Sequence, residues 1–297
     1  MHKQQCGRDG ERNMPVIFKK VSHVYYPNSP FEYEALKQID LTLQDKKFIA
    51  IIGHTGSGKS TLAQHINGLL LPVGGTLDID GLELTFKKRK FLKLKPLRKK
   101  IGFVFQFPEY QLFEETVLKD IVYGPKNFGF TNEEAEARAR DIAEQLNISH
   151  ILDKSPFNIS GGQMRKVAIA GILAYDPDIL LLDEPTRGLD PLGAKEIMQF
   201  FKRLQTEYHK TIIMITHDMD LVYEFSTRVV VMNNGEIVYD GDKVELFKDE
   251  YKNHHLTKPT ILKTIDYINE KTNRNISYNN YTLTDLLKSL KEGDFNE

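Results

Sequence analysis

The chain has 297 residues and carries 40 basic against 41 acidic side chains, which gives a formal net charge of −1. This balance argues against a nucleic-acid binder held by bulk charge. The single cysteine, Cys6, excludes an internal disulfide and fits a reducing compartment. No apolar run approaches the ~20 residues that a membrane-spanning helix needs, so any membrane path used by this chain would belong to another protein.

Residues 1–13, MHKQQCGRDGERN, lack the apolar segment of a signal peptide. We interpret them as a disordered N-terminal extension or as the product of a mis-called start, because Met14 opens the first regular segment, MPVIFKKV. The main domain is expected to run from residue 14 to about residue 246. Residues 247–297 are expected to form a C-terminal helical extension.

The stretch GHTGSGKS, from Gly53 to Ser60, matches the phosphate-binding P-loop pattern G-x-x-x-x-G-K-[ST]. The apolar run FIAII before it suits a buried parallel strand, and STLAQHINGLL after it suits a helix whose positive end faces an anion. In this pattern Lys59 reaches the β/γ-phosphates and the Ser60 hydroxyl is a Mg²⁺ ligand. The residues expected to contact the nucleotide here are Gly53, His54, Thr55, Gly56, Ser57, Gly58, Lys59, Ser60 and Thr61.

The stretch KKRKFLKLKPLRKK, residues 87–100, holds nine basic side chains in fourteen positions. A polybasic segment of this kind could contact anionic lipid head groups. A solvated loop leading into the next strand is the simpler interpretation, and we favour it.

Gln106, in GFVFQFPE, opens a helical insertion that we expect at about residues 107–176. Its segment TNEEAEARARDIAEQL starts with a capping box, Thr131 and Glu134, and has apolar residues at helical spacing. The later segment NISGGQ places Ser160 at the N-cap of the helix GGQMRKVAIAGILA. Such a helix end presents free N–H groups to an anion and predicts a second phosphate site. Its expected residues are Ser160, Gly161, Gly162 and Gln163.

The segment ILLLDEP, residues 179–185, is a continuous hydrophobic strand that ends in two acids. This segment resembles a Walker B motif, and the resemblance implies that Asp183 holds Mg²⁺ and that Glu184 orients and polarises the attacking water beside the γ-phosphate. His217 ends the strand-like segment TIIMITH; taken alone, such a histidine is an ordinary strand-end residue. The strands RVVVM and EIVYDG, joined by the turn NNG at residues 233–235, close the core.

The P-loop and the NISGGQ segment stand about a hundred residues apart in one chain, and with the DEP acids they resemble the motifs of ABC-type ATPases. The resemblance implies an α/β fold: a P-loop NTPase core with a mostly parallel sheet flanked by helices, an antiparallel β edge subdomain and an α-helical subdomain. It also implies an ATPase that binds ATP and Mg²⁺. NISGGQ then corresponds to the signature motif, and GLD at residues 188–190 to the D-loop.

The same resemblance implies roles for single residues. Gln106 corresponds to the Q-loop glutamine that touches Mg²⁺ and the lytic water, and His217 to the switch histidine that contacts the γ-phosphate. Tyr25 matches the aromatic residue that stacks on adenine, with Tyr26 as its close rival. The expected catalytic residues are therefore Glu184, His217, Gln106 and Lys59, and the expected metal ligands are Ser60, Gln106 and Asp183.

In ABC ATPases the signature of one domain closes on the P-loop of another, head to tail, which creates two ATP sites at a dimer interface. This chain has one P-loop and one signature, so the resemblance implies a second ATPase subunit as partner. Whether that partner is a paralogue or another copy of this chain stays open.

The segment QFPEYQLFEETVLKDIVYGPKNFG, together with GHTGSGKST, SPFNISGGQMRKVAIAGILA and DEPTRGLDP, is similar to ATPases of energy-coupling factor (ECF) transporters, the vitamin and transition-metal importers. The similarity covers about residues 14–246. It implies a peripheral protein on the cytoplasmic face of the cell membrane, coupled near the Q-loop to a membrane T subunit. A separate membrane S subunit would bind the substrate, so this sequence does not name it. Glu109, Glu114 and Glu115 either border the coupling groove or form a solvated acidic face.

Arg187 departs from the family pattern, in which alanine mostly occupies this position. It either makes a cross-interface contact or faces solvent, and we slightly favour solvent. The adjacent His254 and His255 have no acid or cysteine at ligand-like spacing, so we interpret them as surface residues and not as a metal site.

The C-terminal extension contains two amphipathic helix patterns. The first places Ile261, Leu262, Ile265 and Ile268 on one face. The second places Leu283, Leu286, Leu287 and Leu290 on one face, after a Thr282-x-x-Asp285 capping box. Such helices resemble the extensions through which ECF ATPases contact each other; a weakly packed tail is the alternative.

Two rival functions fit parts of the sequence. The first is the ATPase of another ABC transporter branch with a dedicated permease, and the ECF-like Q-loop segment argues against it. The second is a soluble, non-transport ABC ATPase that acts on DNA or the ribosome. Members of that class carry two ATPase domains per chain or long coiled coils between the motifs. Here about a hundred residues without sustained heptads separate the P-loop from the signature.

Overall fold

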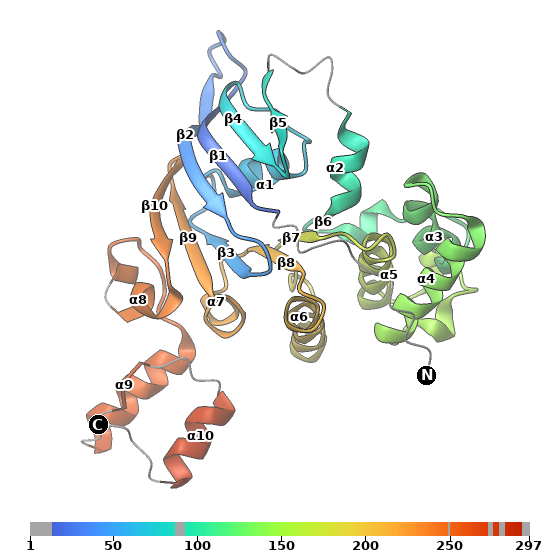
Figure 1. The fold of residues 1–297 in the computed structure, drawn as a ribbon. Helices are drawn as coiled ribbons and strands as arrows, with labels where there is room; N and C mark the ends of the chain where they lie inside the picture. The colour runs from blue at the N-terminus through green and yellow to red at the C-terminus, as the bar shows by residue number, and fades with distance from the viewer. Residues whose placement is uncertain (1–13, 87–92, 249, 273–275, 279–282, 293–297) are drawn as a thin grey trace.

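The computed structural model describes residues 14–86, 93–248, 250–272, 276–278 and 283–292 (Figure 1). The expected N-terminal extension, residues 1–13, and Thr282 of the expected capping box lie outside the described residues. The described part forms two sheets, a helical lobe on one side of the larger sheet, and a pair of C-terminal helices on the other side (Figure 1).

A six-stranded sheet with the strand order β10-β9-β3-β8-β7-β6 forms the centre of the molecule. Its pairings are parallel except for the hairpin of the last two strands in the chain. The strands are β3 (Phe48–Ile52), β6 (Ile101–Val104), β7 (Ile179–Asp183), β8 (Thr211–Ile215), β9 (Arg228–Asn233) and β10 (Glu236–Gly241). Because the strands are parallel, the loops that follow β3, β7 and β8 emerge at the same edge of the sheet.

Strand β3 divides its side chains between two hydrophobic cores. Phe48, Ala50 and Ile52 belong to the core shared with the helices, whereas Ile49 and Ile51 belong to the core between the two sheets. This division follows from the two-residue period of a strand. The core between the sheets is closed by helix α1 (Lys59–Ile66) and by an antiparallel sheet of order β2-β1-β4-β5. The strands of that sheet are β1 (Val16–Tyr25), β2 (Tyr33–Leu43), β4 (Gly74–Ile79) and β5 (Leu82–Leu84).

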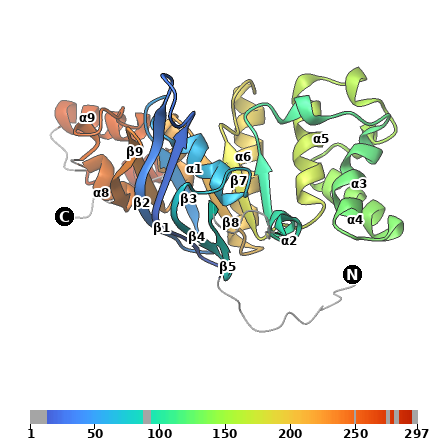
Figure 2. The ribbon, with the colours of Figure 1, turned by 90° about the horizontal axis from the view of Figure 1, so that it is seen from above.

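The helical lobe consists mainly of α3 (Val117–Asn127), α4 (Asn132–Gln145) and α5 (Gly161–Leu173), which pack on one another (Figure 2). The expected capping box of α4 is confirmed: Thr131 Oγ1 accepts from the Glu134 N–H at 3.2 Å, and Glu134 Oε2 accepts from the Thr131 N–H at 2.9 Å. Short 3-10 turns connect the lobe; they are η2 (Pro108–Gln111), η3 (Ser149–Ile151) and η4 (Pro156–Asn158). Three further helices contribute to the same hydrophobic core as the lobe. They are α6 (Pro191–Thr206), α7 (Met219–Phe225) and α8 (Lys243–Lys248).

The second half of the basic stretch is a helix, α2 (Leu94–Lys100), so its interpretation as a loop is wrong there; residues 87–92 lie outside the described residues. Leu97 is buried in the core between the sheets, and Leu94 packs against that core. The two leucines are three positions apart and therefore lie on the same face of the helix. Its basic side chains also have protein partners. Lys100 pairs with Asp80, Arg98 donates to Gly68 O, and Lys99 Nζ lies over the ring of Phe130.

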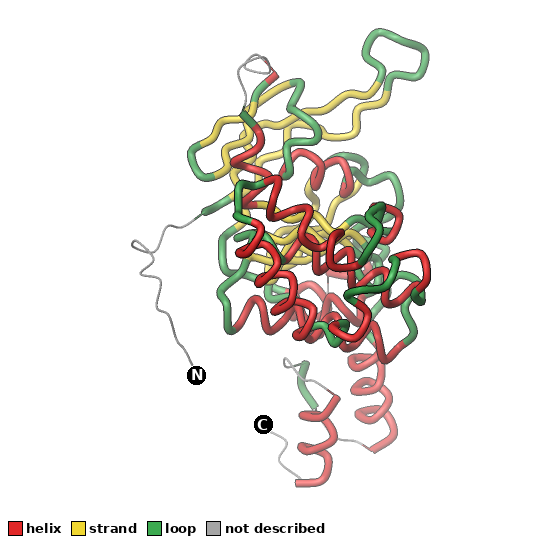
Figure 3. The backbone as a smooth tube through the Cα atoms, turned by 90° about the vertical axis from the view of Figure 1, so that its right-hand side faces the viewer, coloured by secondary structure: helices red, strands yellow, loops and turns green. Residues whose placement is uncertain are grey.

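The C-terminal extension continues through η5 (Glu250–Lys252) into α9 (Thr260–Thr272) and α10 (Leu283–Glu292), which project from the rest of the chain (Figure 3). Leu262, Ile265 and Leu286 are buried in a cluster that is continuous with the main core. Leu287 is 50% exposed, so this chain covers only part of the leucine face of the second helix. Successive helical positions point about 100° apart, and the burial of Leu286 therefore turns Leu287 outward.

His254 is not a plain surface residue. Its Nε2 lies 3.9 Å from Glu250 Oε2, and its ring centre lies 6.1 Å from that of Tyr239. An acid does stand four positions before it, which corrects the expectation that none has a suitable spacing. His255 is exposed. Among the described residues no group of three His, Cys, Asp or Glu could hold a metal ion, and no helix is long and apolar enough to cross a membrane.

Two buried histidines meet where β1 contacts α1. His65 is fully buried, its Nδ1 donates to Thr61 O at 2.7 Å, and its ring centre lies 4.8 Å from that of His23. Burial lowers the pKa of His65 to about 4, and burial also lowers the pKa of His23. Both rings are therefore neutral in the folded protein at pH 7.

Between about pH 4 and an unfolded-state pKa near ~6.5, His65 binds a proton when the chain is unfolded and not when it is folded. The free energy of unfolding should therefore fall as the pH decreases from 7 to 5, by up to ~1.4 kcal/mol per pH unit from this residue. His65→Asn keeps a donor for Thr61 O and should make the slope shallower. Urea unfolding at pH 7, 6 and 5 measures both slopes, and equal slopes would contradict this account.

Candidate active site

The loop between β3 and α1 has the backbone shape of a phosphate cradle. Gly53 has φ of 146°, and a Cβ there would lie 2.1 Å from Met232 O. Gly58 has φ of 104°, and a Cβ there would lie 2.6 Å from Ala35 O. Only glycine fits these two positions. Helix α1 begins with neither a side-chain cap nor an acid in its first turn, so its N-terminal N–H groups face an anion site.

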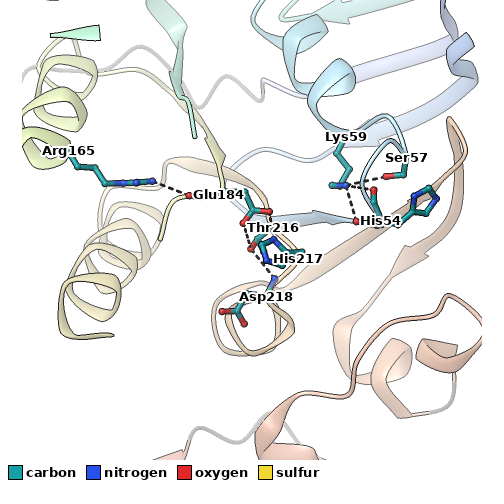
Figure 4. A network of polar contacts seen from close by, with 9 residues as sticks. His54, Ser57, Lys59, Arg165, Glu184, Thr216, His217 and Asp218 are labelled. Carbon is teal, nitrogen blue, oxygen red and sulfur yellow. Dashed lines mark hydrogen bonds and ion pairs between the residues drawn. The ribbon is translucent and has the colours of Figure 1, made fainter. Parts of the chain in front are cut away.

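The Lys59 ammonium group lies at the centre of this loop. Its Nζ donates to Gly53 O at 2.9 Å, to His54 O at 2.7 Å and to Ser57 Oγ at 3.3 Å (Figure 4). Burial lowers the pKa of Lys59, and the charges of Glu184 and Asp183 oppose that shift. The loop therefore holds a partly buried cation beside the uncapped N-terminus of α1, an arrangement that suits phosphate oxygens.

Two acids follow the buried part of β7, two strands away from β3 in the sheet. Burial and the neighbouring Glu184 raise the pKa of Asp183 to about 6, against the effect of Lys59. A carboxylate whose negative charge is only partly compensated suits a divalent cation. The exposed Ser60 hydroxyl stands on the first turn of α1, and the partly buried Gln106 stands just after β6. Ser60 follows β3 and Gln106 follows β6, so both residues lie at the sheet edge where the parallel strands end.

The structure brings Glu184 and His217 together. The His217 Nδ1 lies 2.6 Å from Glu184 Oε1, and the Thr216 hydroxyl donates to Glu184 Oε2 at 3.1 Å (Figure 4). Glu184 has a left-handed φ of 48°, and its N–H donates to Ile215 O at 2.9 Å. Its side chain is 14% exposed, whereas that of His217 is 76% exposed. The carboxylate is thus held at both oxygens, while the histidine ring faces outward.

The NISGGQ segment forms a separate anion-binding helix end. Ser160 Oγ accepts from the Gln163 N–H at 3.3 Å, and Gln163 Oε1 accepts from the Ser160 N–H at 3.1 Å. Gly161 and Gly162 border open space. A cavity of about 270 Å³ beside this motif is lined by the motif and the D-loop, and no P-loop residue lines it. The structure therefore does not bring the two predicted phosphate sites together within one chain.

The aromatic candidates near the P-loop differ in exposure. Tyr25 is partly buried, and its hydroxyl group lies 3.3 Å from Thr61 Oγ1 on α1. Tyr26 is 70% exposed. Tyr33 was not predicted as a site residue, but its hydroxyl group donates to Gly56 O in the P-loop at 2.7 Å.

Arg187 is exposed, as expected, but it also has a partner. Its guanidinium carbon lies 5.3 Å from the centre of the Phe107 ring, which follows Gln106 directly. The D-loop arginine thereby contacts the Q-loop of its own chain.

Arg165 is a site residue that the motif analysis missed. It is only 3% exposed, and its guanidinium group donates to Arg187 O at 2.5 Å and to Glu184 O at 3.0 Å (Figure 4). Burial lowers its pKa, opposed by the charge of Glu109. The signal was present in the helix periodicity, because Arg165 shares a face with Ile169 and Leu173 at i+4 and i+8. A charged residue on an apolar face indicates buried partners.

Arg165→Met should lower the kcat for ATP hydrolysis by about 10–100-fold, since two partly buried carbonyls lose their donor and the backbone of Glu184 is free to move. The affinity for ATP should change little, because no P-loop contact is lost. Steady-state kinetics and equilibrium nucleotide binding separate these effects. Lys166→Met is the matched control. Lys166 is the next residue in the helix, and its side chain pairs with Glu196 at 3.2 Å and not with Glu184. Wild-type turnover in Arg165→Met would contradict a role in positioning Glu184.

The P-loop before α1, the acid pair after β7, the histidine after β8 and the signature at the start of α5 together define an ABC-type ATPase domain. The family model described as ABC transporter matches residues 36–187. The chain belongs to this family, and within it to the energy-coupling factor transporter ATP-binding proteins. The expected fold class, ATPase activity and ECF resemblance are confirmed.

Curated relatives and solved structures support this assignment. Energy-coupling factor transporter ATP-binding protein EcfA2 of Clostridium perfringens (strain 13 / Type A) is 50% identical over 238 residues, which cover 80% of this chain and 82% of the relative. EcfA2 of Ligilactobacillus salivarius (strain UCC118) is 45% identical over 290 residues, 96% of this chain and 100% of the relative.

Among solved structures, cbiO1 from Clostridium perfringens, part of the ABC transporter complex cbiONQ, superposes with a TM-score of 0.72 at 33% identity, covering 89% of this chain and 97% of that chain. A dimeric post-hydrolysis state of the ATP-binding cassette MJ0796, bound to ADP and Pi, superposes with a TM-score of 0.69 at 31% identity, covering 76% and 98%.

Proposed function

We propose that the chain is the ATP-binding and ATP-hydrolysing subunit of an ECF-type importer for a vitamin or a transition-metal ion. It would act as a peripheral protein on the cytoplasmic face of the cell membrane. The observation that carries the proposal is the Glu184 carboxylate, held by Thr216 and His217 at the sheet edge where the P-loop also begins. The family and the similarity to EcfA2 proteins support the transport role.

The P-loop would bind the substrate phosphates through its backbone N–H groups. Lys59 would exchange its bonds to the Gly53 and His54 carbonyls for phosphate oxygens. Tyr25 would stack on adenine, because its hydroxyl contact with Thr61 holds the ring beside the P-loop helix.

Ser60, Gln106 and Asp183 would hold Mg²⁺, which would neutralise charge on the phosphate oxygens. Glu184 would accept the proton of the attacking water, with its carboxylate oriented by His217 at one oxygen and by Thr216 at the other. His217 would contact the γ-phosphate with its exposed ring. The carbonyl of Glu184, bonded to Arg165, fixes the backbone on which this carboxylate stands.

The signature would serve the ATP of a second ATPase subunit. Ser160, Gly161 and Gly162 are exposed, and the cavity beside them has no P-loop wall. Their helix end would therefore close on a γ-phosphate held by the partner, and the partner's signature would close on the site of this chain. The dimeric form of the MJ0796 cassette supports this arrangement.

The membrane T subunit would dock beside the Q-loop. The segment after Gln106 carries two pairs of exposed aromatic rings in contact, Phe107 with Tyr110 and Phe113 with Tyr123. Glu115 is exposed and pairs with Lys119, so it fits a rim that could meet basic side chains. Glu109 differs, because one of its carboxylate oxygens is buried and its charge acts on Arg165. It is therefore not part of a solvated acidic face.

Glu184→Gln should lower ATP hydrolysis by roughly 10²–10⁴-fold while ATP still binds, because the amide cannot accept the proton of water. Lys59→Ala should instead abolish productive nucleotide binding. Phosphate release and equilibrium binding of a labelled nucleotide distinguish the two defects. Glu144→Gln, an exposed position on α4, serves as a control. Normal turnover in Glu184→Gln would refute the assignment of the general base.

The transporter class is tested by purifying the tagged full chain from detergent-solubilised native membranes and identifying its companions by mass spectrometry. A second ATPase, one shared T-type membrane protein and several small S-type membrane proteins are expected. A single dedicated permease, or soluble partners alone, would leave the ATPase chemistry intact and exclude the ECF class.

A further inference from the structure

The C-terminal extension contacts the segment that carries the switch histidine. Asp220, in the first turn of α7, stands three residues after His217. Its Oδ1 accepts from the Thr260 N–H at 2.5 Å, and its Oδ2 accepts from the Thr260 hydroxyl at 2.7 Å. Thr260 is the first residue of α9. The carboxylate therefore caps a helix that lies 40 residues further along the chain, where a negative charge is favoured by the helix dipole.

An unbroken chain of hydrogen bonds leads from this contact to the general base. The Asp220 N–H donates to Asp218 Oδ1 at 2.9 Å, and the Asp218 N–H donates to Thr216 Oγ1 at 3.1 Å. The Thr216 hydroxyl donates in turn to Glu184 Oε2 at 3.1 Å (Figure 4). Thr216 and Asp218, the two neighbours of His217, take part in these bonds, so the start of α9 and the carboxylate of Glu184 are joined through one short segment.

A cavity provides a second, independent contact between the extension and the site. It has a volume of about 210 Å³ and is lined on one side by the P-loop and the switch segment, through His54, His217 and Met219. The other wall includes residues 254–257 of the extension. His254 is held in this wall by Glu250 and Tyr239. The extension thus borders the space beside the histidine ring as well as holding the backbone that follows it.

We propose that the C-terminal extension positions the switch segment for hydrolysis, with Asp220 and Thr260 as positioning residues. This inference rests on the proposed ATPase function of the chain. Neither residue touches the nucleotide loop, so losing their contact leaves the phosphate cradle intact. It releases the segment 216–220, and with it the orientation of His217 and Glu184.

Thr260→Val removes the hydroxyl donor, and Asp220→Asn removes the charged acceptor. Each should lower kcat for ATP hydrolysis by about tenfold, while KM for ATP and equilibrium ATP binding stay within about twofold. Thr260→Ser keeps the hydroxyl group and should restore wild-type kcat. The double variant should lose no more than the stronger single variant, because both changes break the same contact.

Thr264→Val is the matched control. Its hydroxyl donates at 2.9 Å to Thr260 O within α9, one turn further along the same helix, and its loss should leave kcat unchanged. The variants are measured as full chains in the assembly recovered from membranes, with thermal unfolding recorded to verify folding. Amide hydrogen exchange of residues 216–221 gives a readout besides turnover: Thr260→Val should accelerate it and Thr264→Val should not.

Wild-type kcat together with unchanged exchange in Thr260→Val would overturn the positioning role and leave the ATPase assignment standing. A wild-type assembly without any turnover would reject the proposed function itself. Equal losses of kcat in Thr260→Val and Thr264→Val would show a general effect of the helix and would also overturn the specific contact.

Discussion

The structure of the site depends on placing two adjacent carboxylates at the end of an apolar strand. Strand β7 is buried up to Asp183, and burial raises the pKa of that acid to about 6. Like charges so close together in a partly buried place need compensation. Lys59 supplies a positive charge from the P-loop, while Thr216 and His217 bond to the Glu184 carboxylate. The two acids and their partners come from three separate segments and meet only because β3, β8 and β7 are parallel neighbours.

The backbone of Glu184 is constrained as tightly as its side chain. A left-handed φ at a residue other than glycine costs on the order of 1–3 kcal/mol and persists where surrounding bonds maintain it. The N–H of Glu184 bonds to Ile215 O, and its C=O accepts from Arg165. The guanidinium group thereby ties the helix that begins with the signature to the residue proposed as general base, inside a single subunit. Motion of α5 during closure would consequently be felt at Glu184.

Features set by local sequence were predictable. The P-loop, the capping box at Thr131, the N-cap at Ser160 and the hairpin turn at Asn234 and Gly235 depend on residues a few positions apart. Features set by distant contacts were not. Helix α2 was taken for a loop because its charge obscured the spacing of Leu94 and Leu97. The two carbonyl partners of Arg165, and the contact of Asp220 with Thr260, join positions separated by 19 to 40 residues, and no local pattern encodes them.

Strand β3 has side chains in both hydrophobic cores, and the P-loop begins where it ends. The position of β3 between the two cores therefore determines the position of the P-loop that follows it. A bulkier residue in one core would push the strand toward the other core unless a smaller residue there made room. Among relatives that keep a working cradle, sizes of core residues on opposite faces of the sheet should accordingly vary together, with gains in volume on one face matched by losses on the other.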